Sequence, residues 1–349
     1  MMNKKEINEI KKQMTAANCN ISRICGCYVN GEKEKVSVWK SNFLSLPEEE
    51  MFKYLDIFKK TLSGTVGKNL LNMEYETAED LPLQKQLLDI RNTKLNDDDL
   101  LNEFFDDVIG SYQDAGNYYI ILANGIYDIP SKAKDGEILD SVDVFDYLLC
   151  AICPVELAKP GLSYHAENGK FEDRNRDWVA GMPLHGFLWP AFTDRQANIH
   201  EVLYYTKKSA DIQETFIQNV IGTKIPNSCE EEKESFHSLF DKGITFEKVQ
   251  EIHQEIAALQ EMEDEPLKLD EKMLGNVFEK TDTPMPETFK GSILATNVLS
   301  GMNKVKVADT TITTNEPLEL KVIDGKKYIL VPADAEINFN DIRVNYKEA

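Results

Sequence analysis

YYIILA at residues 118–123 and VFDYLLCAIC at residues 144–153 decide the fold. Both runs have the density of β-branched, aliphatic and aromatic side chains that is typical of strands buried on both faces. The polar stretch 131–141 separates them, and Pro154 ends the second run. We therefore predict two buried strands.

Amphipathic segments flank these two runs. Residues 3–16 carry apolar side chains at helical spacing, and a second helix is predicted to begin after Ser45, with Glu48 completing a capping box, and to stop near Gly64. A third helix is expected to begin in the Asn-Asp cluster at 96–99. Helices around buried strands predict an α+β fold with a mixed sheet.

A chain of 349 residues has room for two or three domains, at about 100–200 residues each. We expect an α+β core over 1–225, an acidic helical segment and linker over 226–287, and a small β-rich module over 288–349. In the last region Asp324-Gly325 separates two short β runs, which is a strong hairpin signal.

The formal net charge is -21, but it is unevenly distributed. Residues 74–157 carry 5 basic and 19 acidic side chains, and residues 229–280 carry 6 and 15. Residues 1–73 carry 12 and 8, and residues 158–208 carry 7 and 6. Broad binding to duplex DNA is therefore disfavoured, because it needs many Lys and Arg contacts to phosphate. The charge distribution does not exclude a compact anion-binding site in 1–73 or 158–208.

Neither a membrane-spanning run of about 18 apolar residues nor an apolar signal segment near the charged N-terminus is found in the sequence. Six cysteines are few for this length, and reduced thiols are the default without export. These observations predict a cytoplasmic protein with no membrane association.

The cysteines form a C-x-C and a C-x-x-C pair. In principle four thiolates could close a zinc site, but the second pair lies in an apolar run without the turns that zinc knuckles use. We interpret all four as small buried hydrophobic residues and expect no metal and no cofactor. The alternative zinc ligands are Cys25, Cys27, Cys150 and Cys153.

The glycine-rich run SGTVGKN at 63–69 resembles a phosphate loop only superficially. Leu62 stands where a Walker loop needs glycine, and Asn69 where it needs Ser or Thr. We interpret the run as a helix end followed by a turn, with an anion contact through Lys68 as the alternative.

Aromatic and guanidinium side chains gather in the Pro- and Gly-rich region that follows Pro154. Forked donors and aromatic faces suit recognition of phosphate or nucleobases. The plainer interpretation is an aromatic core whose loops are held by Arg–Asp pairs. The candidate ligand-binding residues are Arg174, Arg176, Trp178, Trp189 and Arg195, together with Lys68.

His200 and Asp194 lie in the same region and could act as an acid–base pair if the fold brings them together. Whether the protein is an enzyme is left open, because no known nucleophile or metal-protease motif is found in the sequence.

Several long segments resemble one uncharacterised family, domain of unknown function 4317, which occurs in clostridia and related Firmicutes. They include ISRICGCYVNGEK at 21–33, CPVELAKPGLSY at 153–164 and IHEVLYYT at 199–206. The resemblance extends to about residue 225 and more loosely to the C-terminal β module. It implies a bacterial cytosolic setting but supplies no activity and no catalytic residues.

The leading hypothesis is a cytosolic binding or regulatory protein that recognises an anionic ligand, a nucleotide or RNA, through residues 159–206. One alternative is a small-molecule enzyme that uses the pair His200 and Asp194. Another is an acidic scaffold that binds a basic partner such as a ribosomal protein.

Overall fold

The computed structural model describes the chain except residues 76–80, 133–137, 241–243, 264–265, 285–288, 290, 301–303, 315–317, 332–336, 340–341 and 345–349. It contains two compact units, Met1–Glu230 and Glu231–Ala349. The domain boundaries at 225 and 287 stay predictions. None of the helices in the described parts of the chain is long and apolar enough to cross a membrane.

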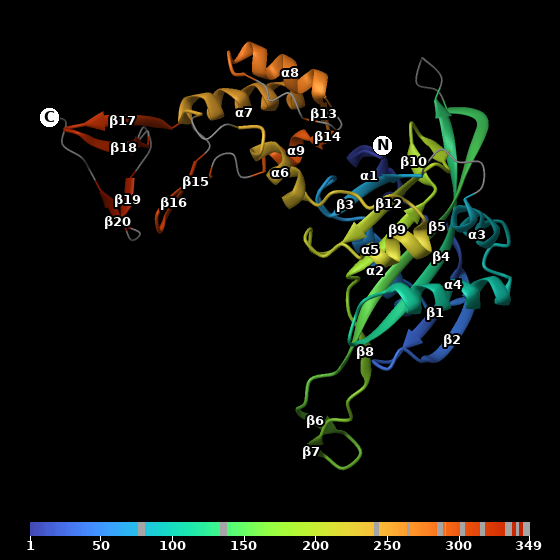
Figure 1. Cartoon of the computed structure of the whole chain (residues 1–349). Coiled ribbons are helices and arrows are strands. Elements are labelled where there is room, and N and C mark those ends of the chain that lie inside the picture. The colour runs from blue at the N-terminus through green and yellow to red at the C-terminus, as the bar shows by residue number, and fades with distance from the viewer. Residues whose placement is uncertain are drawn as a thin grey trace. The chain divides into compact units, whose positions relative to one another are not determined.

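An eight-stranded sheet organises unit 1, with the order β2-β1-β4-β5-β9-β12-β3 and with β8 paired to β5 (Figure 1). The two strands predicted from the apolar runs lie at its centre and continue well beyond those runs. The strands are β1 (Ile21–Val29), β2 (Lys35–Asn42), β3 (Leu70–Glu74), β4 (Asn117–Lys132), β5 (Ile138–Leu157), β8 (Trp178–Ala180), β9 (His185–Trp189) and β12 (Glu201–Thr206).

The α+β class is confirmed, but every pairing between described strands of this sheet is antiparallel rather than mixed. The reason lies in the connections. β4 and β5 follow each other as one long hairpin, and the helices before them do not return the chain to a parallel neighbour. The prediction of a mixed sheet is therefore wrong in the direction of pairing.

Helices cover both faces of the sheet. Alternate side chains of the central strands therefore enter different cores: Leu122 and Cys150 pack on one side, Ile121 and Ala151 on the other. This two-sided burial explains why the two central runs are apolar throughout. The first core includes α3 (Pro82–Asn92), α4 (Asp98–Ser111), α5 (Glu214–Phe216) and the π-helical turn Ile217–Ile221; the second includes α1 (Lys4–Lys12) and α2 (Glu48–Thr61).

The helix ends only partly follow the predicted signals. The capping box predicted at Ser45 is wrong, because Pro47 is the N-cap of α2 and the Ser45 hydroxyl donates to the Asn42 carbonyl at 2.7 Å. Proline at this position sets the backbone before the helix without any side-chain cap. The helical segment before Gly222 ends at this glycine, which has a φ of 84°.

Unit 2 begins with helices that share one apolar core. The acidic helices α6 (Cys229–His237) and α7 (Phe246–Glu261) pack with α8 (Glu271–Lys280), α9 (Ala295–Val298) and the strand pair β13 (Lys268–Asp270) and β14 (Ser292–Leu294). Most of their charged residues are at least partly exposed, but Glu232 of α6 is buried and accepts from Asn297 Nδ2 at 2.7 Å. The core includes Phe236, Ile252, Ile256, Leu274 and Phe278.

Short hairpins follow in the C-terminal part of unit 2. The predicted turn is confirmed: Asp324 and Gly325 have φ values of 49° and 77° and join β17 (Glu319–Ile323) to β18 (Lys326–Leu330). The other two hairpins pair β15 (Lys304–Val307) with β16 (Thr310–Thr313) and β19 (Ile337–Phe339) with β20 (Ile342–Val344).

Candidate functional site

A long excursion leaves the sheet between β5 and β8; we call residues 158–180 the arm. Its outer part is the hairpin of β6 (Leu162–His165) and β7 (Lys170–Asp173), which extends away from the body of unit 1 (Figure 1). Its root is closed, because Leu157 pairs with Trp178 and the amide of Ala158 donates to the Asp177 carbonyl at 2.8 Å.

One face of the arm carries exposed apolar side chains, with Asp173 opposite Leu162 on the same face. Tyr164 and Phe171 are cross-strand partners with ring centroids 5.5 Å apart, and Leu162 lies two residues from Tyr164 on the same face. These side chains are 59%, 69% and 71% exposed, in that order. His165 and Lys170 pair on the opposite face. A lone two-stranded hairpin is marginally stable in water, so this apolar face favours a binding role.

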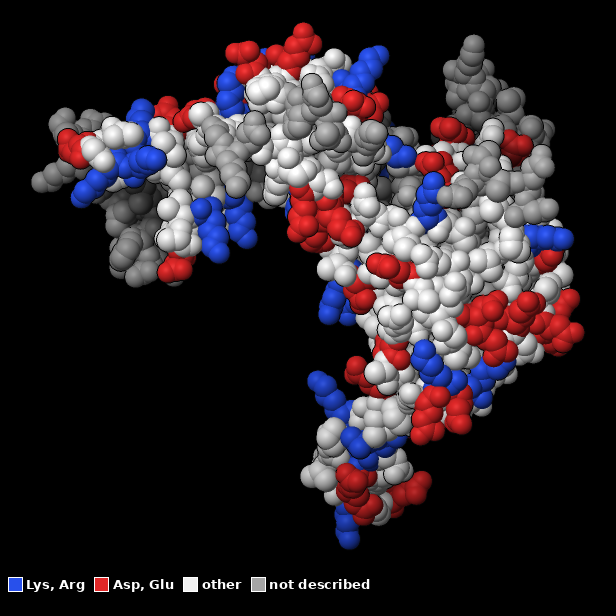
Figure 2. Space-filling view, viewed as in Figure 1, with Lys and Arg blue, Asp and Glu red and all other residues white. Residues whose placement is uncertain are grey.

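Three of the predicted ligand-binding residues lie together near the root of the arm. Arg174 and Arg176 are exposed, and within the described residues neither guanidinium forms an ion pair or a side-chain hydrogen bond. Trp178 is 56% exposed. Figure 2 shows basic and acidic side chains interspersed over this part of unit 1 rather than a patch of one sign.

Arg195 has a different role from the arginines of the arm. It follows Asp194 in the two-residue turn of the hairpin between β10 (Ala191–Thr193) and β11 (Gln196–Asn198). Its guanidinium donates to the Glu9 carboxylate of α1 at 3.0 Å, and the Tyr127 hydroxyl donates to the same carboxylate at 2.8 Å. Arg195 therefore fastens the hairpin to α1.

His200 and Asp194 do not form the predicted acid–base pair. Asp194 lies at the tip of the β10–β11 hairpin, whereas His200 follows the base of the hairpin, where Ala191 pairs with Asn198. At about 3.3 Å of rise per residue, tip and base are roughly 10 Å apart. Both residues are exposed, and in the described structure they share neither a hydrogen bond nor an ion pair.

Lys68 also lies outside the arm. It occupies the turn before β3, where its amide donates to the Thr65 carbonyl at 3.0 Å. The neighbouring Asn69 holds this turn against the end of β12 by donating to the carbonyls of Thr206 and Lys207, each at 3.2 Å. The turn is thus part of the scaffold, and Lys68 joins none of the other candidate residues.

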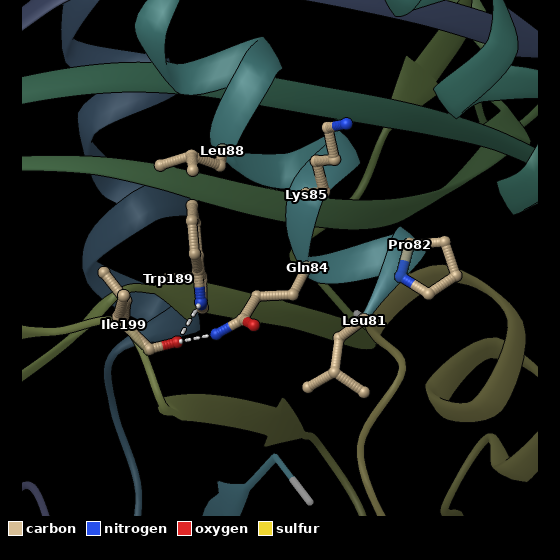
Figure 3. Close-up of a pocket in the computed structure, with 7 residues that line it drawn as sticks. All are labelled: Leu81, Pro82, Gln84, Lys85, Leu88, Trp189 and Ile199. Carbon is tan, nitrogen blue, oxygen red and sulfur yellow. Dashed lines mark hydrogen bonds between the residues drawn. The ribbon is translucent and has the colours of Figure 1, made fainter. Parts of the chain in front are cut away.

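Trp189 is the candidate residue that lines a cavity. The cavity has a volume of about 490 Å³ and lies between α3 and the ends of β9 and β11. Trp189 is fully buried by the surrounding protein, and its indole N–H donates to the Ile199 carbonyl at 3.1 Å. Figure 3 shows the lining side chains, which are Leu81, Pro82, Gln84, Lys85, Leu88, Trp189 and Ile199.

Helix α3 places three of its residues around Trp189 at helical spacing. Gln84 donates from Nε2 to the Ile199 carbonyl at 2.7 Å, the same oxygen that accepts from the indole (Figure 3). Leu88 follows one turn later, and the guanidinium carbon of Arg91 lies 5.5 Å from the indole centroid. The ring is thus fixed in orientation before any ligand arrives.

The four cysteines of the alternative zinc site do not converge. Cys25 and Cys150 share one face of the sheet but stand on either side of Leu122, two strand spacings or about 10 Å apart. Cys153 faces the opposite core. Burial raises the pKa of Cys27 to about 11 and that of Cys153 to about 12, so the thiols are protonated at neutral pH.

The acidic side chains of α4 are partly paired within unit 1. Asp98 accepts from Lys40 at 2.5 Å and Asp106 from Lys35 at 2.8 Å, both across to the edge strand β2. These pairs connect α4 to β2. The basic-partner hypothesis stays a prediction.

His185 is a residue whose importance the sequence did not signal. It is 2% exposed at the start of β9, with Tyr112 Oη 2.8 Å from Nδ1 and the Asp211 backbone oxygen 3.0 Å from Nε2. Burial lowers its pKa, against the opposing effect of the Asp211 carboxylate. Only the fold joins these three distant segments, so no local pattern could have revealed the network.

Comparison with known proteins identifies one family. The profile described as Domain of unknown function (DUF4317) matches residues 2–342. No curated protein matches the sequence.

Proposed function

The chain belongs to the family described as Domain of unknown function (DUF4317), and from that premise we propose that it is a cytosolic binding protein whose arm recognises single-stranded RNA. The observation that carries the proposal is the arm itself. It combines uncovered aromatic side chains with two arginines that have no ion-pair partner in the described structure.

The shape of the arm favours a polymer over a mononucleotide. Small-molecule sites are concave and bury most of the ligand. The arm is a projecting hairpin whose residues 166–180 are all exposed, so it can lie along an extended partner but cannot enclose a nucleotide. Of the two anionic ligands expected from the sequence, RNA is the one we propose.

The side chains of the arm suit unpaired bases. Single-stranded nucleic acids bind where bases stack on aromatic rings, at about 1–3 kcal/mol per base, while cations contact phosphates. Tyr164, Phe171 and Trp178 offer such rings, and Arg174 and Arg176 offer the cations.

The carboxylates of the arm lie on both of its faces, and Asp173 stands opposite Leu162 on the face of Tyr164 and Phe171. Glu172 pairs with Ser163 on the face opposite to Tyr164 and Phe171, and it accepts from the Asn168 amide at 2.9 Å. Lys159, Lys170 and the two arginines balance the four acidic residues of the arm in number. Stacking of bases on the aromatic rings, more than the net charge of the arm, would therefore supply the affinity for RNA.

The test is a titration of the full chain with a fluorescently labelled 20-nucleotide single-stranded RNA, followed by anisotropy at several salt concentrations. With at most four cations in contact, the slope of log affinity against log salt should lie between about -1.4 and -2.8. Trp178 is the most exposed of the three tryptophans, so its emission should be quenched by bound bases. Duplex DNA should bind at least tenfold more weakly.

Substitutions locate the binding to the arm. Trp178→Ala and the double variant Arg174→Ala/Arg176→Ala should each weaken binding about tenfold, which corresponds to loss of one stack or two phosphate contacts. The matched controls are Phe52→Ala and Lys53→Ala, which remove an exposed aromatic and an exposed cation from α2. Equal binding by arm and control variants, or no RNA binding with capture of a protein on the arm, would refute the proposal.

A further inference from the structure

We propose that the Trp189 cavity is a second, independent binding site that takes a small aromatic carboxylate. Its volume of about 490 Å³ lies within the roughly 300–1,000 Å³ typical of small-molecule sites. It is distinct from the arm, because none of its lining residues belongs to 158–180.

The walls of the cavity specify an apolar, flat ligand. Leu81, Pro82 and Leu88 from the α3 side line the cavity together with Trp189 and Ile199 (Figure 3). A flat ring that enters between these walls would pack against Leu81, Leu88 and Ile199, because the indole of Trp189 is itself fully buried. Burial of the ring also removes apolar surface from water on both partners.

The floor of the cavity is preorganised. The Ile199 carbonyl accepts from the Trp189 indole at 3.1 Å and from Gln84 Nε2 at 2.7 Å, and Arg91 lies at 5.5 Å from the indole centroid. The hydrogen bond and the guanidinium fix the indole, and Gln84 fixes the carbonyl that accepts from it. The floor beneath a ligand is therefore already ordered in the free protein, which improves affinity.

The polar groups of the cavity favour a ligand that carries a carboxylate. Lys85 is exposed at the rim, and in the described structure its ammonium group has no ion-pair partner. Because Gln84 uses Nε2 to hold Ile199, its Oε1 remains as an acceptor for a hydroxyl on the ligand. One cation at the open end of an apolar slot matches a ring that carries one carboxylate.

The experiment is an isothermal titration of the full chain with three probes: phenylacetate, 4-hydroxyphenylacetate and the neutral phenylacetamide. Ligands of this size should bind with a dissociation constant on the order of 1 mM or below. We expect both carboxylates to bind more tightly than the amide, and 4-hydroxyphenylacetate to bind most tightly.

Two variants place the ligand in the cavity. Lys85→Gln should weaken carboxylate binding about three- to fivefold and leave binding of the amide unchanged, as expected for an exposed ion pair. Pro82→Trp adds bulk at the exposed rim, where folding is least affected, and should abolish binding of all three probes. Lys53→Gln, on the opposite helical layer, is the matched control and should bind like the parent.

Several results would overturn the inference. They are absence of heat with all three probes, equal affinity for acid and amide, or binding that survives Pro82→Trp. Trp178→Ala should bind the probes normally, which separates the outcome from that of the RNA experiment. Binding lost in Trp178→Ala but kept in Pro82→Trp would assign the ligand to the arm instead.

Discussion

Tyr112 and His185 share a hydrogen bond of 2.8 Å, between Tyr112 Oη and His185 Nδ1, inside the core on the α4 side of the sheet. The other ring nitrogen, Nε2, lies 3.0 Å from the backbone oxygen of Asp211. Because that oxygen can only accept, Nε2 carries the proton and Nδ1 accepts from the tyrosine hydroxyl. Both nitrogens are satisfied by a neutral imidazole.

This arrangement predicts that protonation of His185 in the unfolded chain lowers the stability of the protein at acid pH. Burial lowers the pKa of His185 in the folded state below the value of about 6.5 in the unfolded chain. As the pH falls below about 6.5, the unfolded state binds a proton that the folded state refuses, so the free energy of unfolding falls. The slope is at most about 1.4 kcal/mol per pH unit for one proton. Urea unfolding at pH 7.5 and 5.5 measures it.

His185→Gln is the control for this pH effect. It should be less stable at pH 7.5 but should lose less stability than the parent between pH 7.5 and 5.5. The comparison also cancels Asp146 and Glu232, whose pKa values burial raises and which therefore act with the opposite sign. Identical pH slopes in parent and variant would show that His185 does not titrate on unfolding.

Gly26 should not tolerate a side chain. A Cβ added there would overlap the phenol of Tyr119, which is held by the Trp39 indole at 2.8 Å and by the Tyr54 hydroxyl at 3.1 Å. We expect Gly26→Ala to lower the free energy of unfolding by about 1–3 kcal/mol. Gly110→Ala is the control, because nothing lies within 4 Å of the added carbon and alanine favours the helix. The change in the free energy of unfolding, measured by denaturant unfolding, should be negative for Gly26→Ala and positive for Gly110→Ala.

The thiols should be protected in the folded protein. Five of the six cysteines are buried, and Cys19 alone is partly exposed. A chromogenic disulfide should therefore react with at most one thiol per chain at pH 8, and with six after unfolding in guanidinium chloride. Cys19→Ser should remove the native reaction. Rapid reaction of two or more thiols in that variant would contradict the buried placement.

Arginines of the arm and of the β10–β11 hairpin should have separable effects. Arg195→Ala removes the contact with Glu9 and should cost at most about 1 kcal/mol, since the Arg195 side chain is 37% exposed and solvent screens the pair. It should leave RNA binding unchanged. Arg174→Ala/Arg176→Ala should weaken RNA binding and leave the stability of the protein unchanged. Thermal unfolding measures the stability of both variants, and titration with RNA measures their affinity.

The centre of the sheet could be predicted, because β4 and β5 are buried on both faces over the runs at 118–123 and 144–153, and these runs are hence apolar throughout. The pairing direction could not be predicted from the order of elements, since only tertiary contacts place β3 beside β12 and β12 beside β9.

The cavity could be predicted only in part. Trp189 was a candidate because of its aromatic neighbours, but the opposite wall is α3, about 100 residues earlier, and no helix was expected at 82–92. Arg195 shows the reverse case: its type and neighbourhood suggested a ligand contact, whereas the fold gives its guanidinium a carboxylate partner from α1. Residue type alone does not distinguish a structural arginine from a binding one.

The closed root of the arm also makes the arm exchangeable. Leu157 and Trp178 are neighbours across two strands, and the hydrogen bond from Ala158 to Asp177 lies just outside them. The sheet therefore continues without interruption whatever the chain does between residues 159 and 176. Length and sequence in that interval can change by insertion, deletion or grafting while the scaffold stays intact, so members of the family can diversify there at little cost to folding.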